Sequence, residues 1–213
     1  MKSQMKNIMA FAALAALTTF SLARADDTTS QSGMAKAQQL ASTVCVACHG
    51  ADGNSASPNF PKLAGQQPEY ITKQLMNFKS GARTNPIMQG IVTSNNLTPD
   101  DMKNLGIYFS QQTIKPGAAK DKTLAEEGEK IFKGGDAATG TPACAACHGP
   151  TGAGIPSEFP RLAGQHAAYI YAQLNNFRLG DRSNDGGKMM RTIAARLTDH
   201  EMKAVADYVS GLQ

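Results

Sequence analysis

Apolar residues in this chain recur at the three- and four-residue intervals of amphipathic helices. One such segment begins near Pro68, carries Tyr70, Leu75 and Phe78 on one side, and stops at Gly81. A segment 99 residues further on repeats this pattern. We find no alternation of apolar and polar residues long enough to build a sheet, so the pattern predicts an all-α fold.

Further helices are predicted on either side of these two segments. Thr98 and Thr198 are each followed three residues later by an acidic residue, which is the spacing of a capping box. The final helices that they open carry apolar stripes: Met102, Leu105 and Phe109, and Met202, Val205 and Val209. We expect an early helix from about Met34 to residue 45, and a counterpart over 124–133 that is followed by a loop over 134–142.

These similarities belong to an internal repeat. Phe-Pro-Lys-Leu-Ala-Gly-Gln at 60–66 recurs as Phe-Pro-Arg-Leu-Ala-Gly-Gln at 159–165, an offset of 99 residues. The offset becomes 102 at Met88 and Met190, and 100 in the final helices, which two small changes in loop length explain. The chain is therefore predicted to be a tandem duplication.

The first 25 residues are typical of a secretory signal. Lysines at 2 and 6 precede an apolar run over 8–22, and Ala23-Arg24-Ala25 has the small-x-small cleavage pattern. The apolar run is shorter than the roughly 20 residues of a membrane helix, although retention as an uncleaved anchor is the alternative. We expect a signal peptide over 1–25, an N-terminal domain over 26–112, an exposed linker over 113–122 and a C-terminal domain over 123–213.

The charge of the mature chain argues against a nucleic-acid partner. The full chain has 21 basic and 17 acidic side chains, and removing the signal removes three basic residues and no acid. The mature chain is then near neutral, with both signs interspersed.

All four cysteines lie in two copies of one motif, Cys45-Val46-Ala47-Cys48-His49 and Cys144-Ala145-Ala146-Cys147-His148. This C-x-x-C-H pattern is typical of covalent c-type haem attachment. On a helix, two cysteines three positions apart share a face, and the following histidine is the proximal iron ligand. We therefore expect two covalently bound haem c groups. Each half has only about 90 residues, and a haem would serve as the centre of its small core.

Three other uses of the cysteines must be weighed against haem attachment. A zinc site would pool the two C-x-x-C pairs, but the 95 residues between Cys48 and Cys144 far exceed the usual spacing of about 15–20. Disulfides are compatible with an oxidising compartment. A thioredoxin-like pair, a third alternative, would lie near a βαβ pattern, which we do not find, and would not need a histidine after the second cysteine of both copies.

Histidine is a poor candidate for the sixth iron ligand. Between residues 26 and 122 the only histidine is His49, which the motif already uses. His166 and His200 align with Gln67 and Asp100 in the other half, which suggests ordinary surface residues.

Methionine is the remaining strong candidate, since a thioether favours the reduced iron. Met102 and Met202 correspond in the repeat, but they lie on the buried stripes of the final helices. Met88 and Met190 also correspond, and we expect them in irregular stretches rich in Asn, Pro and Gly, from which they can reach a haem. We therefore predict the ligand pairs His49 with Met88 and His148 with Met190. Met189 is an adjacent rival.

With these motifs, the repeated F-P-x-L-A-G-Q segment and the late methionine, nearly the whole mature chain resembles the dihaem cytochrome c4 family. The resemblance implies two class I cytochrome c folds related by a pseudo-twofold axis, with the haems near the domain interface. It also implies that the carbonyl groups of Pro61 and Pro160 accept hydrogen bonds from His49 and His148.

The repeated polar residues Gln66, Arg83, Gln165 and Arg182 are either propionate-binding groups or solvated surface. One departure from the class I pattern concerns the glycine and aromatic residue on the first helix. Gly128 and Phe132 fit it, whereas the first half has Gly33 with Ala37 or Leu40.

The function implied is periplasmic one-electron transfer, with no catalytic residues. The redox partners implied are a quinol-oxidising complex as donor and a haem–copper oxidase as acceptor. We expect a monomer, and peripheral membrane association is left open. The alternatives are the dihaem subunit of a dehydrogenase such as a flavocytochrome, and a small dihaem peroxidase or thiosulfate-oxidising enzyme.

Overall fold

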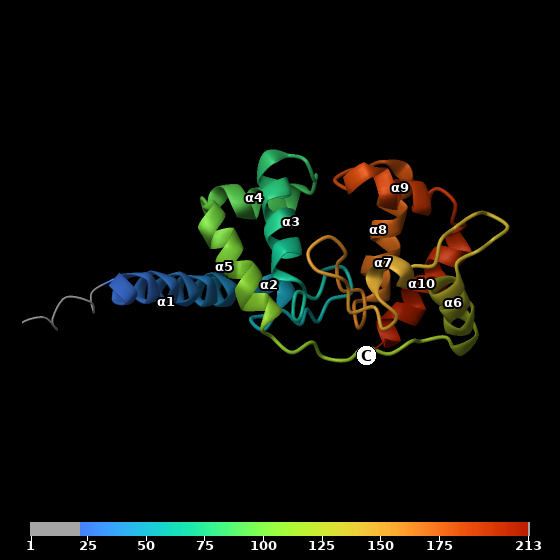
Figure 1. Ribbon diagram of the computed structural model, residues 1–213, viewed down its shortest axis with the longest axis horizontal. Coiled ribbons are helices and arrows are strands. Elements are labelled where there is room, and N and C mark those ends of the chain that lie inside the picture. Colours follow the sequence, from blue (N-terminus) through green and yellow to red (C-terminus); the bar gives the residue numbers. More distant parts are fainter. Residues whose placement is uncertain (1–21, 213) are drawn as a thin grey trace, which may run out of the picture. The chain divides into compact units, whose positions relative to one another are not determined.

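The computed structural model describes residues 22–212 and is helical throughout (Figure 1). Its elements are α1 (Leu22–Leu40), the π-helical turn η1 (Ala41–Cys45), α2 (Val46–His49), α3 (Pro68–Ser80), α4 (Pro86–Ser94), α5 (Pro99–Ser110), α6 (Lys122–Gly134), α7 (Ala145–His148), α8 (Ala167–Leu179), the 3₁₀ turn η2 (Gly186–Lys188), α9 (Met189–Ala194) and α10 (Asp199–Gly211). The only β pairing in the described residues is two isolated bridges, Asp136 with Thr141 and Ile155 with Phe159. The all-α prediction is confirmed.

The chain divides between residues 32 and 33 into two units. The first contains the predicted signal peptide, of which residues 1–21 lie outside the described part of the chain. Helix α1 begins at Leu22, well before the expected start near Met34, so that prediction was wrong about where the helix begins. No helix among the described residues is both long and apolar enough to cross a membrane.

The two halves of the second unit are built around separate apolar clusters. In the first half, α3, α4 and α5 contribute Ile71, Phe78, Val92 and Leu105, and α1 contributes Ala37. The second half has the matching cluster. It contains Ile170, Phe177, Ala194, Val205 and Phe132. The stripes predicted for the final helices are buried in both halves.

Close helix crossings explain the glycine on the first helix of each half. In the second half, a Cβ atom on Gly128 would overlap the carbonyl oxygen of Ala204, so only glycine allows α6 to approach α10 this closely. In the first half, Gly33 lies against Asn104 of α5, and Ala37 is buried one turn later. The docking of the first helix, uncertain from the sequence, therefore uses Gly33 and Ala37 even though the aromatic residue is missing.

The predicted helix caps are confirmed. Thr98 and Asp101 form a reciprocal capping box at the start of α5, and Thr198 and Glu201 do the same at α10. Gly81, with a φ of 79°, ends α3 in the left-handed conformation that glycine tolerates.

The segment between the halves is hydrogen-bonded to both of them. Asn54 in the first half accepts from the backbone N–H of Lys115 at 2.7 Å. In the second half, the buried carboxylate of Asp207 accepts from the backbone N–H groups of Lys120 and Asp121 at 2.9 and 3.0 Å. Most side chains of the segment are exposed, as expected, but its backbone is held along its length.

We predict that Gly128→Ala destabilises the haem-loaded protein by about 1–3 kcal/mol, since the added methyl group must push α6 away from α10. Thermal unfolding measures the change. Gly134→Ala on the same helix is the matched control, because a Cβ atom there meets nothing within 4 Å. Equal stability of the two variants would contradict this account of the crossing.

A second prediction concerns Asp101, whose carboxylate pairs with Lys36 at 2.6 Å and caps α5. Burial alone would raise the pKa of Asp101, but Lys36 and the backbone N–H and hydroxyl of Thr98 stabilise the carboxylate and lower that pKa. We expect Asp101→Asn to cost about 1 kcal/mol at neutral pH. Because the pKa of Asp101 is lower in the folded than in the unfolded state, its carboxylate stabilises the protein fully above the ordinary aspartate pKa of about 4. This stabilisation is lost as the pH falls through the folded-state pKa. Denaturant unfolding across this range should show the two proteins converging at low pH; a constant gap would contradict the assignment.

Candidate haem sites

Each C-x-x-C-H motif lies on one turn of helix. Cys45 ends η1 and Cys48 and His49 lie on α2, while Cys147 and His148 lie on α7 directly after Cys144. All four cysteines are unpaired, so neither motif forms a disulfide in this structure. The part of the chain that the structure describes contains no cluster of three or more His, Cys, Asp or Glu side chains suited to a metal ion.

The two motif histidines are oriented by backbone carbonyl groups. The Nδ1 atom of His49 lies 2.9 Å from the carbonyl oxygen of Pro61, and His148 makes the same contact, also 2.9 Å, with Pro160. Because a carbonyl oxygen can only accept, Nδ1 must carry the proton and donate it, which leaves the lone pair of Nε2 free for a metal. Burial lowers the pKa of both histidines, an effect that the proline carbonyls oppose. The neutral ring that a metal requires is thus favoured.

The two methionines lie on short helices, not in the irregular stretches that the sequence suggested. Met88 is on α4, where the Asn85 side chain caps the helix by accepting from the backbone N–H of Met88 at 3.0 Å. Met190 is on α9, which a partly buried ion pair between Asp185 and Arg191, at 2.7 Å, anchors. The expectation was wrong because a single cap or ion pair is enough to hold one or two helical turns against the core. Neither anchor was recognised in the sequence, although the Asn85-Pro86 pair is a helix-start signal.

A continuous cavity of about 920 Å³ brings the predicted site residues together. All eight of them line it: Cys45, Cys48, His49, Met88, Cys144, Cys147, His148 and Met190. The rest of its wall includes many apolar side chains, among them Leu63, Phe78 and Leu174. The volume is at the upper end for a small-molecule pocket. An apolar cavity that takes two thiols, an imidazole nitrogen and a thioether from each half suits two haem groups.

The rival ligands are less well placed. Met102 and Met202 are buried in the two apolar clusters and do not line the cavity. Met189 does line the cavity, but its side chain is 42% exposed, whereas Met190 packs against the core of its half.

The two other histidines lie away from the cavity wall. The Nε2 atom of His166 is 2.9 Å from the carbonyl oxygen of Ser55, and that of His200 is 2.6 Å from Glu127 on the surface.

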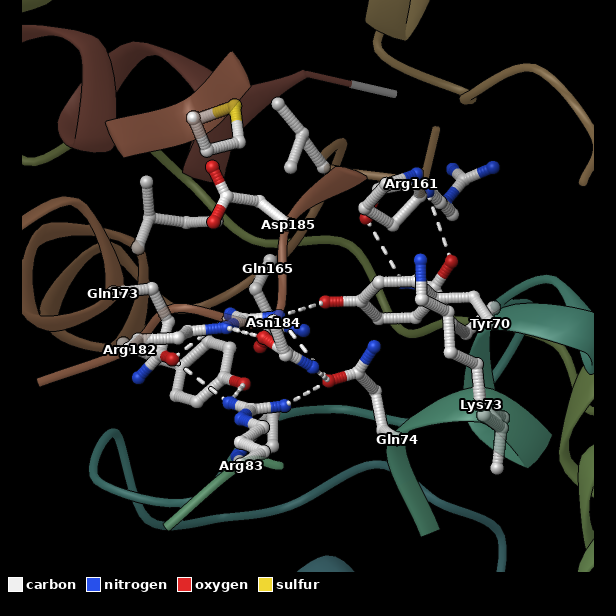
Figure 2. Close-up of a pocket in the computed structure, with 18 of the residues that line it drawn as sticks. Tyr70, Lys73, Gln74, Arg83, Arg161, Gln165, Gln173, Arg182, Asn184 and Asp185 are labelled. Atoms are coloured by element: carbon white, nitrogen blue, oxygen red, sulfur yellow. Dashed lines mark hydrogen bonds between the residues drawn. The ribbon is translucent and has the colours of Figure 1, made fainter. Parts of the chain in front are cut away.

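The repeated arginines are buried between the two halves, so they are not solvated surface. Arg83 donates to Gln74 in its own half, and to Tyr169 and Gln173 in the other, at 2.8, 3.1 and 2.8 Å. Arg182 makes the symmetry-related contacts, including one of 2.9 Å to the hydroxyl group of Tyr70 (Figure 2). Burial alone would raise the pKa of Tyr70, but the positive charges of Arg182 and Arg83 lower it.

Each arginine also lies over an aromatic ring. The guanidinium carbon of Arg83 is 4.7 Å from the ring centre of Phe78, and that of Arg182 is 4.5 Å from that of Phe177. This stacking holds the guanidinium groups at the cavity wall. The hydrogen-bond partners of Arg83 and Arg182 named above include no carboxylate, so these contacts do not neutralise the two guanidinium charges. Anionic groups in the cavity would do so.

Gln66 and Gln165 are buried as well, and each bonds to the backbone of the opposite half. Gln165 pairs with both backbone groups of Lys62, and Gln66 pairs with both backbone groups of Arg161. The repeat singled out these residues, but nothing in one half of the sequence indicates that they bond to the other.

Comparison with known proteins agrees with these features. The family model described as cytochrome c matches the chain twice, over residues 34–112 and 125–213. Cytochrome c4 of Pseudomonas aeruginosa is 48% identical over 182 residues, which cover 84% of this chain and 89% of the relative. The thiosulfate dehydrogenase electron acceptor of Stutzerimonas stutzeri is 41% identical, over 81% of this chain and 80% of the relative.

A solved structure gives the same result for the fold. The crystal structure of reduced recombinant cytochrome c4 from Pseudomonas stutzeri matches with a TM-score of 0.79 and 42% identity, and covers 86% of this chain and 98% of that one. Two tandem cytochrome c domains, each with its own C-x-x-C-H motif, account for two covalently bound haem c groups. The chain therefore belongs to the cytochrome c family and, within it, to the cytochrome c4 proteins, which transfer electrons and are not enzymes.

Proposed function

We propose that the protein is a periplasmic one-electron carrier with two His/Met-ligated haems. Cys45 and Cys48 hold the first haem by thioether bonds, and His49 and Met88 are its axial ligands. Cys144, Cys147, His148 and Met190 do the same for the second. The domains are residues 26–112 and 123–213, joined by the linker over 113–122.

The observation that carries this proposal is the cavity that all eight residues line, with both histidines fixed at Nδ1 by proline carbonyls. Each haem, when bound, supplies a one-electron iron couple. With a histidine and a methionine both bound to it, each iron would have no position left open for a substrate. This arrangement favours electron transfer over catalysis.

The side chains around the cavity limit both the access of water and the movement of the histidine rings. Buried apolar residues such as Leu105 and Val205 line the wall and exclude water. The proline carbonyls hold the histidine rings in one orientation and one tautomer, so little has to move when the charge of the iron changes. A site that reorganises little is suited to rapid electron exchange.

The proposed route places the protein between a quinol-oxidising complex and a haem–copper oxidase, after export and cleavage of the signal over 1–25. The signal-like N-terminus and the cytochrome c4 relatives support this placement. A second candidate donor is a dehydrogenase, as in the flavocytochrome alternative. The relative named as a thiosulfate dehydrogenase electron acceptor favours thiosulfate dehydrogenase as that donor. We propose a monomer in either case.

The axial ligands are tested by the absorption spectrum of the oxidised protein. The far-red band of methionine-bound Fe(III) should have the intensity of two haems. Met88→Ala and Met190→Ala should each remove about half of that band, since each removes the thioether from one of two equivalent sites. Met189→Ala is the matched control and should leave the band intact; loss in that variant in place of Met190→Ala would reassign the second ligand.

The carrier role is tested by stopped-flow kinetics with purified partners. The reduced protein should donate electrons to a haem–copper oxidase, and the oxidised protein should accept them from a quinol-oxidising complex. The rates should fall as salt is added if charged groups steer the encounter. Reduction by thiosulfate dehydrogenase alone would favour the second candidate, and turnover of peroxide or thiosulfate by the isolated chain would contradict a carrier role.

A further inference from the structure

The hydrogen bond that fixes each motif histidine continues through a single peptide unit into the other half of the molecule. The carbonyl oxygen of Pro61, which accepts from His49, belongs to the same peptide unit as the backbone N–H of Lys62. That N–H donates to Oε1 of Gln165 in the C-terminal half at 2.8 Å. The relay therefore runs from the His49 ring, through the 61–62 peptide, to Gln165.

The same relay exists in the opposite direction. His148 donates to the carbonyl of Pro160, and the N–H of the same peptide unit, on Arg161, donates to Oε1 of Gln66 at 2.9 Å. The dashed lines at Arg161 in Figure 2 mark its hydrogen bonds with Gln66, and Gln165 is labelled beside the arginine network. The hydrogen-bond relay that starts at the histidine of one half thus ends at a glutamine of the other half.

Both glutamines are built into place. Gln66 is 7% exposed and Gln165 is 6% exposed. Each side-chain amide also donates its Nε2–H to the carbonyl of the residue it accepts from, at 3.0 Å for Gln66 and 2.9 Å for Gln165. In addition, Oε1 of each glutamine accepts from the backbone N–H of the residue that follows it, Gln67 or His166, at 3.0 Å. This double pairing leaves the amide only one orientation that satisfies its donor and acceptor atoms.

Hydrogen bonds in a chain polarise one another in a low-dielectric interior. An acceptor on the N–H side of a peptide unit draws charge towards its carbonyl oxygen, and the carbonyl then accepts more strongly from the histidine. A histidine that donates more strongly at Nδ1 becomes a more basic ligand at Nε2. A more basic ligand stabilises the oxidised iron and lowers its reduction potential.

We propose that Gln165 and Gln66 are positioning residues that tune the haems crosswise, Gln165 acting on His49 and Gln66 acting on His148. This inference rests on the proposed ligation of the two irons by these histidines. It goes beyond that ligation because it makes the potential of each haem depend on a side chain of the opposite domain. A partner that shifted one domain against the other would then alter both potentials without contacting either haem.

The test is a redox titration of the haem-loaded full chain, followed by NMR so that the methyl signals of each haem report its own potential. Signals are assigned to the two haems with the single methionine variants. Gln165→Leu removes the acceptor from the N–H of Lys62 and should raise the potential of the haem on Cys45 and Cys48 more than that of the other haem. Gln66→Leu should show the reverse pattern.

Three further measurements separate tuning from a structural effect. Gln67→Leu is the matched control, because it loses a bond of 2.8 Å across the same interface, to the carbonyl of Phe159, and leaves both relay peptides intact. Gln165→Glu keeps an acceptor for the N–H of Lys62, and should leave the first potential unchanged or lower it. Amide hydrogen exchange at Lys62 should accelerate in Gln165→Leu and stay slow in Gln165→Glu.

The inference is overturned if Gln165→Leu shifts both haems equally, if it shifts neither while exchange at Lys62 accelerates, or if Gln165→Glu raises the first potential. Should Gln165→Leu fail to fold, the sign of the Gln165→Glu shift decides. The far-red methionine band of the unaltered protein tests the ligation separately. If the band is present and the crossed shifts are absent, the tuning is wrong and the ligation stands.

Discussion

The hydrogen bond from the histidine Nδ1 atom to a proline carbonyl is the contact on which both haem sites depend. It is 2.9 Å long in each half and joins a residue on a short motif helix to a loop twelve residues further on. It fixes the ring orientation and the tautomer, and so the direction in which Nε2 presents its lone pair. The same loop then runs into the interface between the halves, so the geometry of the metal ligand and the docking of the domains share one peptide unit.

The buried interface makes the chain more than two cytochromes joined by a linker. Arginine, tyrosine and glutamine side chains exchange hydrogen bonds across it in symmetry-related pairs, and the backbone of the linker is tied to both sides. Buried polar groups favour one arrangement of the two domains, because any other arrangement leaves some of them unpaired at a cost in free energy. The relative position of the domains is therefore set by paired groups, which the apolar clusters inside each half could not do alone.

Much of the fold followed from local signals in the sequence. The capping boxes at Thr98 and Thr198, the stop at Gly81 and the buried stripes of the final helices all depend on residues within a few positions of one another. The repeat extended these signals to distant residues, and it distinguished Met88 and Met190, which line the cavity, from Met102 and Met202, which fill the core. The early start of α1 and the helices that carry the two methionines were missed, because helix propensity and a single cap give weak signals over one or two turns. The contacts of Gln66 and Gln165 could not be predicted, since they join residues about 100 positions apart whose partners are backbone groups without a side-chain signature.

The ligation of the two irons and the crossed glutamine contacts can be seen together in a high-resolution crystal structure of the haem-loaded protein. We expect each iron to lie between histidine Nε2 and methionine Sδ, with His49 and Met88 at one site and His148 and Met190 at the other. Both proline carbonyls should keep their histidine hydrogen bonds, and both interface glutamines should keep their bonds to the opposite backbone. A different ligand at either iron, or domains docked without the bonds of Gln66 and Gln165 to the opposite backbone, would contradict these expectations.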